Sequence, residues 1–486
     1  MNRICILSCI LASILLSACS GGESSVTDAV GGESNAPETT AEEKLPFLPD
    51  GIDYGGEEYS ILHAQQVSTG PEHNEVTYKL SDIETGDIIA EAIYERTRKA
   101  EEKLNIKIVS DQIAWDTLGE TLSKTVTAGD NAFEAVVGRL ANLAEAVPNG
   151  YLYDLAAIET LNLKNTWWDQ QVNRAMTVGG KQCIATGDLN FYDDYGITCM
   201  MFNKTKFAQR GIAEPYDLVR EGKWTLDAYY EIINEAAEDL NGDGKYDEFD
   251  FYGYVGNLGL MTNLLCGFGE EFSVAEDNGL WKTNMSASLQ DKAVRLAEML
   301  LNNQSVIIVE RKLGYDKGDL LFPNGQALMT TSLVGCIASF RLQMEEDFGV
   351  LPNPKYDEDQ ESYHNIISQH WASSVSVPVT CSDFDRVGYV LETLGYYSEG
   401  TIDAAVIEKN MMTKSTRDED SAEMLELIFD TKVFDTSIIF NWGLYNVWMS
   451  ITGQTSPKIA STLTRESKKV DKQIADYITQ IQNLES

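Results

Sequence analysis

The sequence is poor in histidine, in basic residues and in long apolar runs. Its 486 residues include four His, and 37 Lys and Arg stand against 76 Asp and Glu, which gives a formal charge of −39. This acidity repels phosphates and excludes a general nucleic-acid binder, and it also argues against docking on anionic lipids through a basic surface. No HExxH, GxSxG or phosphate-binding glycine loop occurs. We therefore expect neither an enzyme nor an organic cofactor.

The longest apolar run lies at the N-terminus and is too short to span a membrane. Ile4–Leu16 follows Met1-Asn2-Arg3, whereas a spanning helix needs about 20 apolar residues. A basic start, a short apolar stretch and a small-residue end are typical of a secretory signal peptide. Leu16-Ser17-Ala18-Cys19 resembles a bacterial lipobox, which implies cleavage after residues 1–18 and lipid on the Cys19 thiol. The alternative is an ordinary signal peptide that ends in Ala-Cys.

Residues 19–56 are predicted to be a flexible, lipid-anchored tether. Ser20–Glu43 is rich in Gly, Ser, Glu, Thr and Ala and has no aromatic residue, so it cannot bury enough surface to offset the entropy of ordering it. A coil of about 35 residues spans roughly 30–35 Å. We expect the folded body to lie just above the extracellular face of the cell membrane.

Cysteine indicates neither a disulfide framework nor a zinc site. Outside the signal peptide and Cys19, five cysteines remain, and none belongs to a CxxC pair. They are Cys183, Cys199, Cys266, Cys336 and Cys381. Their apolar surroundings favour small core residues, and a Cys183–Cys199 bridge stays open if the two strands pair.

The remaining chain alternates predicted strands and helices. Apolar runs at Tyr59–Leu62, Ile106–Val109 and Phe133–Val137 predict strands, and helical spacing marks Asp87–Leu104 and Trp115–Ala128. This alternation predicts α/β layers around a largely parallel sheet. Further helices are predicted over 140–147, 225–240, 288–302, 384–398, 402–412, 420–430 and 466–484.

One stretch has the spacing of a calcium-binding loop. Asp239–Asp250 places oxygen-bearing side chains at positions 1, 3, 5, 9 and 12, with glycine at position 6. The predicted ligands of a structural Ca²⁺ are Asp239, Asn241, Asp243, Lys245, Asp247 and Asp250. A helix precedes the loop but a strand follows it, so a paired EF-hand is not expected. The alternative is a surface turn without an ion.

Two tryptophans lie in polar surroundings that suit sugar binding. Trp371 follows Ser368-Gln369-His370, and Trp442 follows Phe440-Asn441. Flat rings beside polar groups suit the CH faces and hydroxyls of sugars. For a single tryptophan, burial in the core is the commoner outcome.

Several stretches, through their order and spacing, resemble the extracellular solute-binding proteins of ABC importers, family 1, and especially the lipoproteins of Gram-positive bacteria. The similarity covers about residues 57–485 and is carried by Thr166-Trp167-Trp168-Asp169-Gln170, Val178–Asp188, Met201-Phe202-Asn203-Lys204-Thr205, Gly222–Asp227, the Asp239 loop, Phe322–Met329 and Gly349–Tyr356.

The resemblance implies an α/β, two-lobed fold of the periplasmic-binding-protein-like type 2, with hinge crossings and a central ligand cleft. Lobe 1 would hold residues 57–195 and 325–380, and lobe 2 would hold 200–320 and 385–486. The crossings would lie near 196–202, 321–328 and 380–386. A cleft between lobes excludes water when it closes, and a permease can recognise the closed shape.

The resemblance also implies a function. The chain would be a monomeric substrate-binding lipoprotein that captures a small solute, most often a sugar or oligosaccharide in this family, and delivers it to ABC permease subunits. The predicted ligand-binding residues are Arg139, Asp188, Tyr192, Trp371 and Trp442. The alternatives are a secreted carbohydrate-active hydrolase and a calcium-dependent surface interaction protein.

Overall fold

The computed structural model describes residues 44–65, 87–190, 192–276, 280–412, 419–454 and 458–484. The chain separates into two compact units, Met1–Leu45 and Pro46–Ser486, and the second is called the body here. The signal peptide, Cys19 and most of the predicted tether lie outside the described residues. Residues 46–56 belong to the body instead, because the Phe47 ring lies 5.6 Å from the Trp167 ring and Tyr54 N–H donates to Leu104 O. The tether therefore ends before residue 56.

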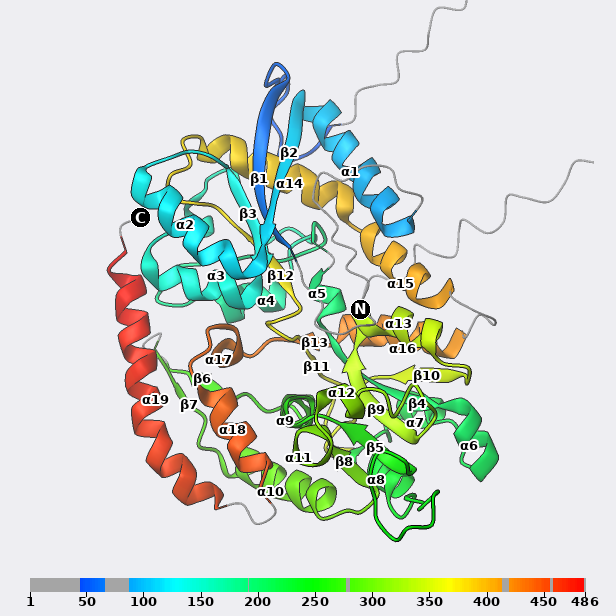
Figure 1. Cartoon of the computed structure of the whole chain (residues 1–486). Helices are drawn as coiled ribbons and strands as arrows, with labels where there is room; N and C mark the ends of the chain where they lie inside the picture. Colours follow the sequence, from blue (N-terminus) through cyan, green and yellow to red (C-terminus); the bar gives the residue numbers. More distant parts are fainter. Residues whose placement is uncertain are drawn as a thin grey trace, which may run out of the picture. The chain divides into compact units, whose positions relative to one another are not determined.

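Among the described residues, one four-stranded sheet organises the first half of the body (Figure 1). Its order is β12–β3–β1–β2, with β1 parallel to both β2 and β3 and β12 antiparallel to β3. The strands are β1 (Glu57–Gln65), β2 (Ile106–Ala114), β3 (Ala135–Arg139) and β12 (Ser373–Ser376). The surrounding elements are α1 (Ile88–Leu104), η2 (Trp115–Thr117), α2 (Leu118–Ala128), α3 (Leu140–Ala146), η3 (Val147–Asn149), η4 (Leu155–Ala157), α4 (Gln170–Met176), α14 (Phe384–Ser398) and α15 (Ile402–Met412).

Alternating side chains bury both faces of this first sheet. Tyr59 and Ile61 pack with α1 and α14 on one face, while Leu62 and Ala64 pack with α2 and α3 on the other. Strand side chains alternate between faces, so a strand covered on both sides is apolar throughout. The predicted helix at 87–104 is confirmed, since Asp87 caps α1 by accepting from Ile89 N–H and Ala90 N–H.

A five-stranded sheet organises the second half, again among the described residues. Its order is β10–β4–β9–β5–β8, with β5 parallel to β8 and β9. The strands are β4 (Thr198–Asn203), β5 (Tyr252–Gly256), β8 (Val306–Ile308), β9 (Ala327–Leu333) and β10 (Phe348–Leu351), and two small sheets pair β6 (Ser273–Ala275) with β7 (Trp281–Thr283) and β11 (Asn365–Ile366) with β13 (Lys432–Val433).

The remaining helices surround this second sheet and the boundary between the halves. They are α5 (Tyr192–Tyr195), α6 (Lys204–Arg210), α7 (Tyr216–Arg220), α8 (Leu226–Ile233), α9 (Leu258–Gly267), α10 (Ala287–Leu301), α11 (Val309–Lys312), α12 (Tyr315–Gly318), η5 (Val334–Cys336), α13 (Ile337–Gln343), α16 (Glu419–Asp430), α17 (Thr436–Ile439), α18 (Leu444–Thr452) and α19 (Ile459–Gln482). Across the part of the chain that the structure describes, no helix is both long and apolar enough to cross a lipid bilayer.

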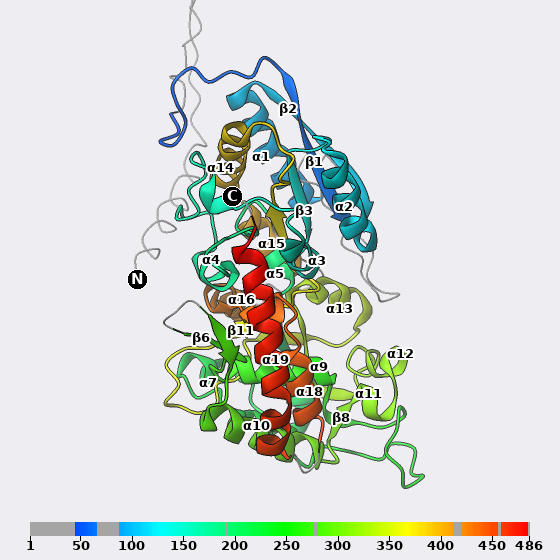
Figure 2. The same cartoon turned by 90° about the vertical axis from the view of Figure 1, so that its left-hand side faces the viewer.

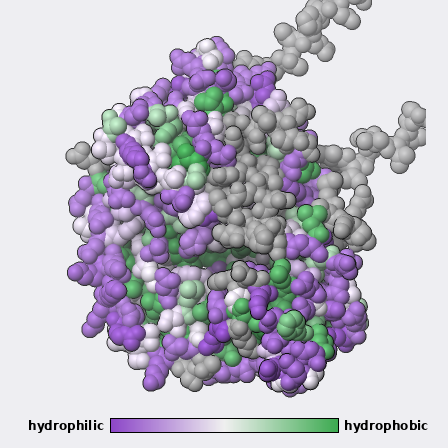
Figure 3. Space-filling view, viewed as in Figure 1, coloured by the Kyte–Doolittle hydropathy of each residue, from purple (hydrophilic) through white to green (hydrophobic). Residues whose placement is uncertain are grey.

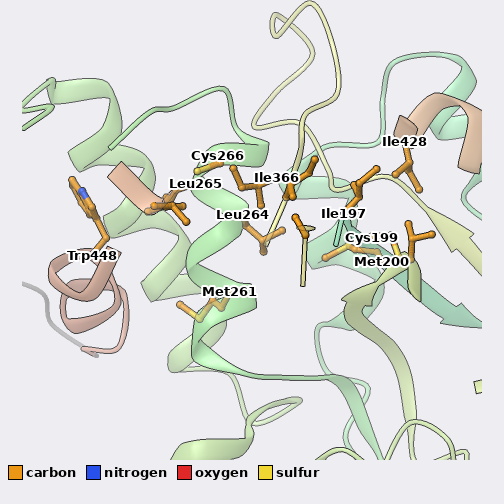
Figure 4. Close-up of a cluster of buried hydrophobic side chains, with 14 of the residues drawn as sticks. Ile197, Cys199, Met200, Met261, Leu264, Leu265, Cys266, Ile366, Ile428 and Trp448 are labelled. Carbon is orange, nitrogen blue, oxygen red and sulfur yellow. The ribbon is translucent and has the colours of Figure 1, made fainter. Parts of the chain in front are cut away.

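Helix α9 carries much of the second core (Figure 4). Its apolar residues lie between Trp448 of α18 on one side and Ile197, Met200 and Ile366 on the other. All five cysteines of the body are buried and none forms a disulfide, so the Cys183–Cys199 alternative is excluded. Burial raises the pKa of the Cys183 thiol to about 12, which keeps it protonated and inert.

The division between the halves differs from the predicted one in two segments. Strands β9 and β10 pair with β4 in the second sheet, so residues 327–351 do not belong with the first lobe. Helices α14 and α15 pack on α1 in the first half, although the prediction placed 385–486 in the second lobe. The predicted helix at 225–240 also ends early, at Ile233, because Asn234 is extended and Glu235 has a φ of 55°.

A buried carboxylate fastens α14 to the first half. Glu392 is fully buried and accepts hydrogen bonds from Trp168 Nε1 at 2.9 Å, Asn165 Nδ2 at 2.6 Å and Asn162 N at 2.8 Å. Burial raises the pKa of Glu392, and the three donors oppose that rise. The Trp-Trp-Asp motif thus joins the helix to the loop that precedes α4.

Replacing Glu392 tests this attachment. We expect Glu392→Ala to lower the free energy of unfolding by about 3 kcal/mol or more, because three donors lose their acceptor in a buried place. Glu392→Gln should lower the free energy of unfolding by less, since one acceptor oxygen remains in its side chain. Urea unfolding of both variants measures the difference, and an Ala variant as stable as the parent would contradict the assignment.

Candidate functional site

Charged and aromatic groups gather where the parallel strands of the first sheet end. Trp115 directly follows β2, and Arg139 is the last residue of β3. The Arg139 guanidinium carbon lies 4.2 Å from the centre of the Trp115 ring. Arg139 is buried and the tryptophan is half-buried. In α/β sheets, ligands commonly bind outside the carboxyl ends of the strands, and this pair lies at such an edge.

A crossing segment, residues 367–372, runs beside this edge. Leu140 N–H donates to Ala372 O at 2.9 Å, and Ala141 N–H donates to Gln369 O at 3.0 Å. His370 and Trp371 therefore lie next to Arg139. Partial burial and the positive charge of Arg139 both lower the pKa of His370, so its imidazole is neutral near pH 7 and can donate and accept hydrogen bonds.

The second sheet presents its own carboxyl ends. Asn257 follows β5, Glu310 follows β8 and η5 follows β9. Glu310 accepts from Leu258 N–H at 3.0 Å, which ties two of these ends together. A Cβ on Gly335 in η5 would lie 3.0 Å from the Tyr195 ring, so η5 packs directly on α5. The carboxyl edge of the second sheet therefore contacts α5, which precedes the crossing from the first half.

The two crossing segments pass each other closely. Ile197 forms an antiparallel bridge with Ile367, and Ser368 N–H donates to Gly196 O at 2.9 Å. A Cβ at Gly196 would lie 2.9 Å from the Ala372 nitrogen, so a side chain there would force the segments apart. Figure 3 shows the surface hollowed across its middle, between the two halves, with hydrophobic residues along the hollow.

The structure brings together two of the five predicted ligand residues. Arg139 and Trp371 lie on adjacent segments, as described above. Tyr192 packs among apolar side chains of α1 and α15. The charge of Asp188 acts on Asp403. Trp442 stacks on Phe440 with ring centres 5.9 Å apart. A role in ligand binding stays a prediction for all five.

Trp115 and His370 are not among the ligand residues predicted from the sequence. The predicted helix begins at Trp115, whereas this residue begins the short η2 turn directly after β2. A polar or aromatic residue at the carboxyl end of a parallel strand is the signal that could have found Trp115.

A charge cluster joins the halves beneath the crossing. Lys432 of β13 lies 3.0 Å from Asp169, and 3.3 Å from both Asp193 and Asp194. These three carboxylates belong to the first half and are buried, while β13 pairs with β11 next to the second sheet. Burial and the neighbouring carboxylates raise the pKa of Asp193 against the opposing effect of Lys432. Burial and the charge of Asp194 likewise raise the pKa of Asp403 on α15.

The predicted calcium loop is closed by its own hydrogen bonds. Asp239 accepts from Gly242 N–H at 2.6 Å and Gly244 N–H at 2.8 Å, and buried Asp250 accepts from Leu240 N–H and Asp247 N–H at 2.9 Å each. Asn241, Asp243 and Asp247 each accept from a backbone N–H two residues on, and Lys245 N–H is one of these donors. Among the described residues, no group of three His, Cys, Asp or Glu side chains is arranged to hold a metal ion. Calcium binding stays a prediction.

Comparison with known proteins gives structural neighbours only. No protein-family profile and no curated protein matches the chain. An ABC substrate-binding protein from Listeria monocytogenes in complex with cycloalternan has 14% identity, covers 86% of this chain and 99% of its own, and gives a TM-score of 0.55. The cyclic α-maltosyl-1,6-maltose binding protein from Arthrobacter globiformis has 14% identity, covers 88% of this chain and 99% of its own, and gives a TM-score of 0.53. UspC from M. tuberculosis has 13% identity, covers 86% of this chain and 100% of its own, and gives a TM-score of 0.55.

At these identities the likeness shows the fold. The body has the predicted α/β, two-lobed, periplasmic-binding-protein-like fold.

The charge cluster predicts an unusual pH dependence. We expect Lys432→Met to lower the free energy of unfolding by about 3–5 kcal/mol at pH 7, because buried carboxylates lose their cation. The pKa values of Asp193 and Asp403 are raised in the folded state, so their ionisation opposes folding above those pKa values. As the pH falls from neutral toward their ordinary range, protonation removes that opposition and the variant should regain stability relative to the parent.

Urea unfolding of parent and variant at several pH values between 7 and about 4.5 measures this effect. Asp193→Asn in the Lys432→Met background is the matched control and should recover part of the loss at pH 7. A stability difference that does not change with pH would contradict the explanation.

Proposed function

We propose that this protein captures a sugar or oligosaccharide between its two lobes outside the cell and delivers it, chemically unchanged, to an ABC permease. The observation that carries the proposal is the Arg139 guanidinium stacked on Trp115 at the carboxyl edge of the first sheet, beside the crossing segments. An aromatic face packs on the CH groups of a sugar ring, and a guanidinium donates paired hydrogen bonds to its hydroxyls.

Two further observations support a sugar as the ligand. His370 and Trp371 add a neutral imidazole and a second half-buried indole next to this pair. Structures with the same fold include one in complex with cycloalternan and one described as a cyclic α-maltosyl-1,6-maltose binding protein. Cycloalternan and cyclic α-maltosyl-1,6-maltose are therefore the first ligands to test.

The proposal also includes the membrane anchor and the partners. Lipid on Cys19 would hold a monomer at the extracellular face, and permease subunits would accept the loaded form. The lipobox-like Leu16-Ser17-Ala18-Cys19 and the polar composition of residues 20–43 support this arrangement.

Calorimetric titration of the purified body tests the ligand class. We expect at least one member of a panel of maltose, maltotriose, maltotetraose, raffinose and cyclic glucose oligosaccharides to bind, and its affinity to fall about tenfold or more in Arg139→Ala and in Trp115→Ala. Arg210→Ala is a matched control, because the guanidinium of Arg210 in α6 lies 4.2 Å from the Phe251 ring, a similar stacking contact outside the Arg139 site. This control should bind like the parent.

Two outcomes would contradict the proposal. One is a panel in which no sugar binds while the protein remains folded. The other is release of shortened sugars from a tightly bound oligosaccharide by pure protein, which would favour a hydrolase.

We also propose that the Asp239–Asp250 loop binds a structural Ca²⁺, supported by its oxygen spacing and by the inward carboxylates of its first and last residues. Calcium at 1 mM should raise the melting temperature above that in EDTA, because a ligand that binds only the folded state stabilises it. Asp243→Ala should remove this shift with little change in EDTA, since Asp243 is exposed and accepts only from Lys245 N–H in the loop. Equal melting temperatures with calcium and EDTA would contradict binding.

A further inference from the structure

A cavity lies between α4, the β6–β7 hairpin and the segment from β13 to α17. Its volume is about 410 Å³, and α4 forms one wall while β6, β7 and the segment from β13 to α17 form the others. In Figure 2, α4 and β6 lie on one side and α3 and α13 on the other, and none of the cavity's lining residues belongs to the Arg139 site. The volume falls within the range of small-molecule sites.

Two opposite charges line this cavity without pairing. Arg174 of α4 and Glu271, just before β6, are both lining residues. Neither side chain forms a hydrogen bond or an ion pair with another described residue. They nevertheless interact at a distance, because the positive charge of Arg174 lowers the pKa of Glu271 against the stronger raising effects of burial and Asp435. An arginine and a carboxylate within reach of each other normally pair, so the space between them can hold a guest.

A buried hydroxyl without a hydrogen-bond partner and an aromatic ring complete the walls of the cavity. Ser273 lines the cavity, is 1% exposed, and its Oγ has no hydrogen-bond partner. Buried hydroxyls are normally hydrogen-bonded, so this orphan is a place for a ligand atom. The half-buried Trp281 ring also lines the cavity and is held by Trp442, whose ring centre lies 6.0 Å away.

The other acidic group of the cavity is already satisfied. Asp435 accepts from Phe272 N at 2.7 Å and from Ser437 Oγ and Ile438 N, so it caps α17. Gln170 is likewise engaged, since its Nε2 donates to Trp168 O at 2.8 Å and to two further carbonyls. The charged and aromatic recognition groups left over are one guanidinium, one carboxylate and one indole face, and the Ser273 hydroxyl, the Gln171 amide and the Thr436 hydroxyl add polar groups.

We propose that this cavity binds a small zwitterion of the amino-acid or betaine type. Its carboxylate would accept paired hydrogen bonds from Arg174, and its ammonium would lie between the Glu271 carboxylate and the Trp281 ring, where charge and cation–π attraction act together. The Ser273 hydroxyl would bond to the carboxylate or the amine. A neutral sugar leaves both protein charges uncompensated and fits these walls less well.

Calorimetry on the purified body, in the absence of sugar, tests this site. The probes are glycine betaine, L-alanine, L-proline and L-phenylalanine, with choline, acetate and maltose as probes that carry one charge or none. We expect at least one zwitterion to bind more tightly than choline and acetate, and its affinity to fall about tenfold or more in Arg174→Gln and in Glu271→Gln. Both residues reach the surface, so the variants should keep the parent's circular dichroism and melting temperature.

The Arg139→Ala variant separates this site from the sugar site. It should bind the zwitterion like the parent, whereas Arg174→Gln should leave oligosaccharide affinity within about twofold, so either proposal can fail alone. Binding of choline alone, or of maltose with sensitivity to Arg174→Gln, would show that the proposed ligand class is wrong. Absence of any zwitterion binding that responds to the two substitutions would overturn the site.

Discussion

The close passage of Gly196–Ile197 against Ile367–Ala372 is the constraint on which the rest of the body depends. These segments connect the two sheets, and their backbones touch at Gly196 because no side chain keeps them apart. Their contact sets where β3 ends relative to residues 369–372, and therefore where Arg139 lies relative to His370 and Trp371. It also brings η5, at the end of β9, against Tyr195. The crossings therefore fix where the edges of the two sheets lie relative to each other.

The charge cluster beneath the crossing has a cost that the surrounding structure must offset. Removing several carboxylates from water is unfavourable, and one ammonium does not neutralise Asp169, Asp193 and Asp194 together. The gain is geometric. Lys432 comes from the chain after α16, while its partners come from residues before the first crossing, so the cluster aligns segments that are far apart in sequence. A purely apolar contact would hold these segments with less directional control, since hydrophobic attraction has no preferred geometry.

The sequence predicted local structure better than it predicted partners. The helix at 384–398 was located correctly from its apolar spacing, yet its attachment to the first half depends on Glu392 reaching Asn162, Asn165 and Trp168, which no local pattern reveals. Strand β2 extends to Ala114, past the predicted end at Val109, because it is an edge strand whose later residues are partly exposed and polar. Because β2 runs further than its predicted end, the prediction placed Trp115 in a helix and not at the end of a strand. Arg139 was predicted from its position in the fold that the resemblance implies, and it is the last residue of the buried strand β3.

The two candidate ligand sites are formed by different residues. None of the residues that line the Arg174–Glu271 cavity belongs to the Arg139 edge, and its walls come from α4, the β6–β7 hairpin and the segment from β13 to α17. A rotation of the halves that moves α4 away from β6 would open this cavity. A guest that bridges α4 and β6 would resist that rotation, and the lining charges would set how strongly. A ligand shifts an equilibrium between two conformations only through its different affinity for the two states.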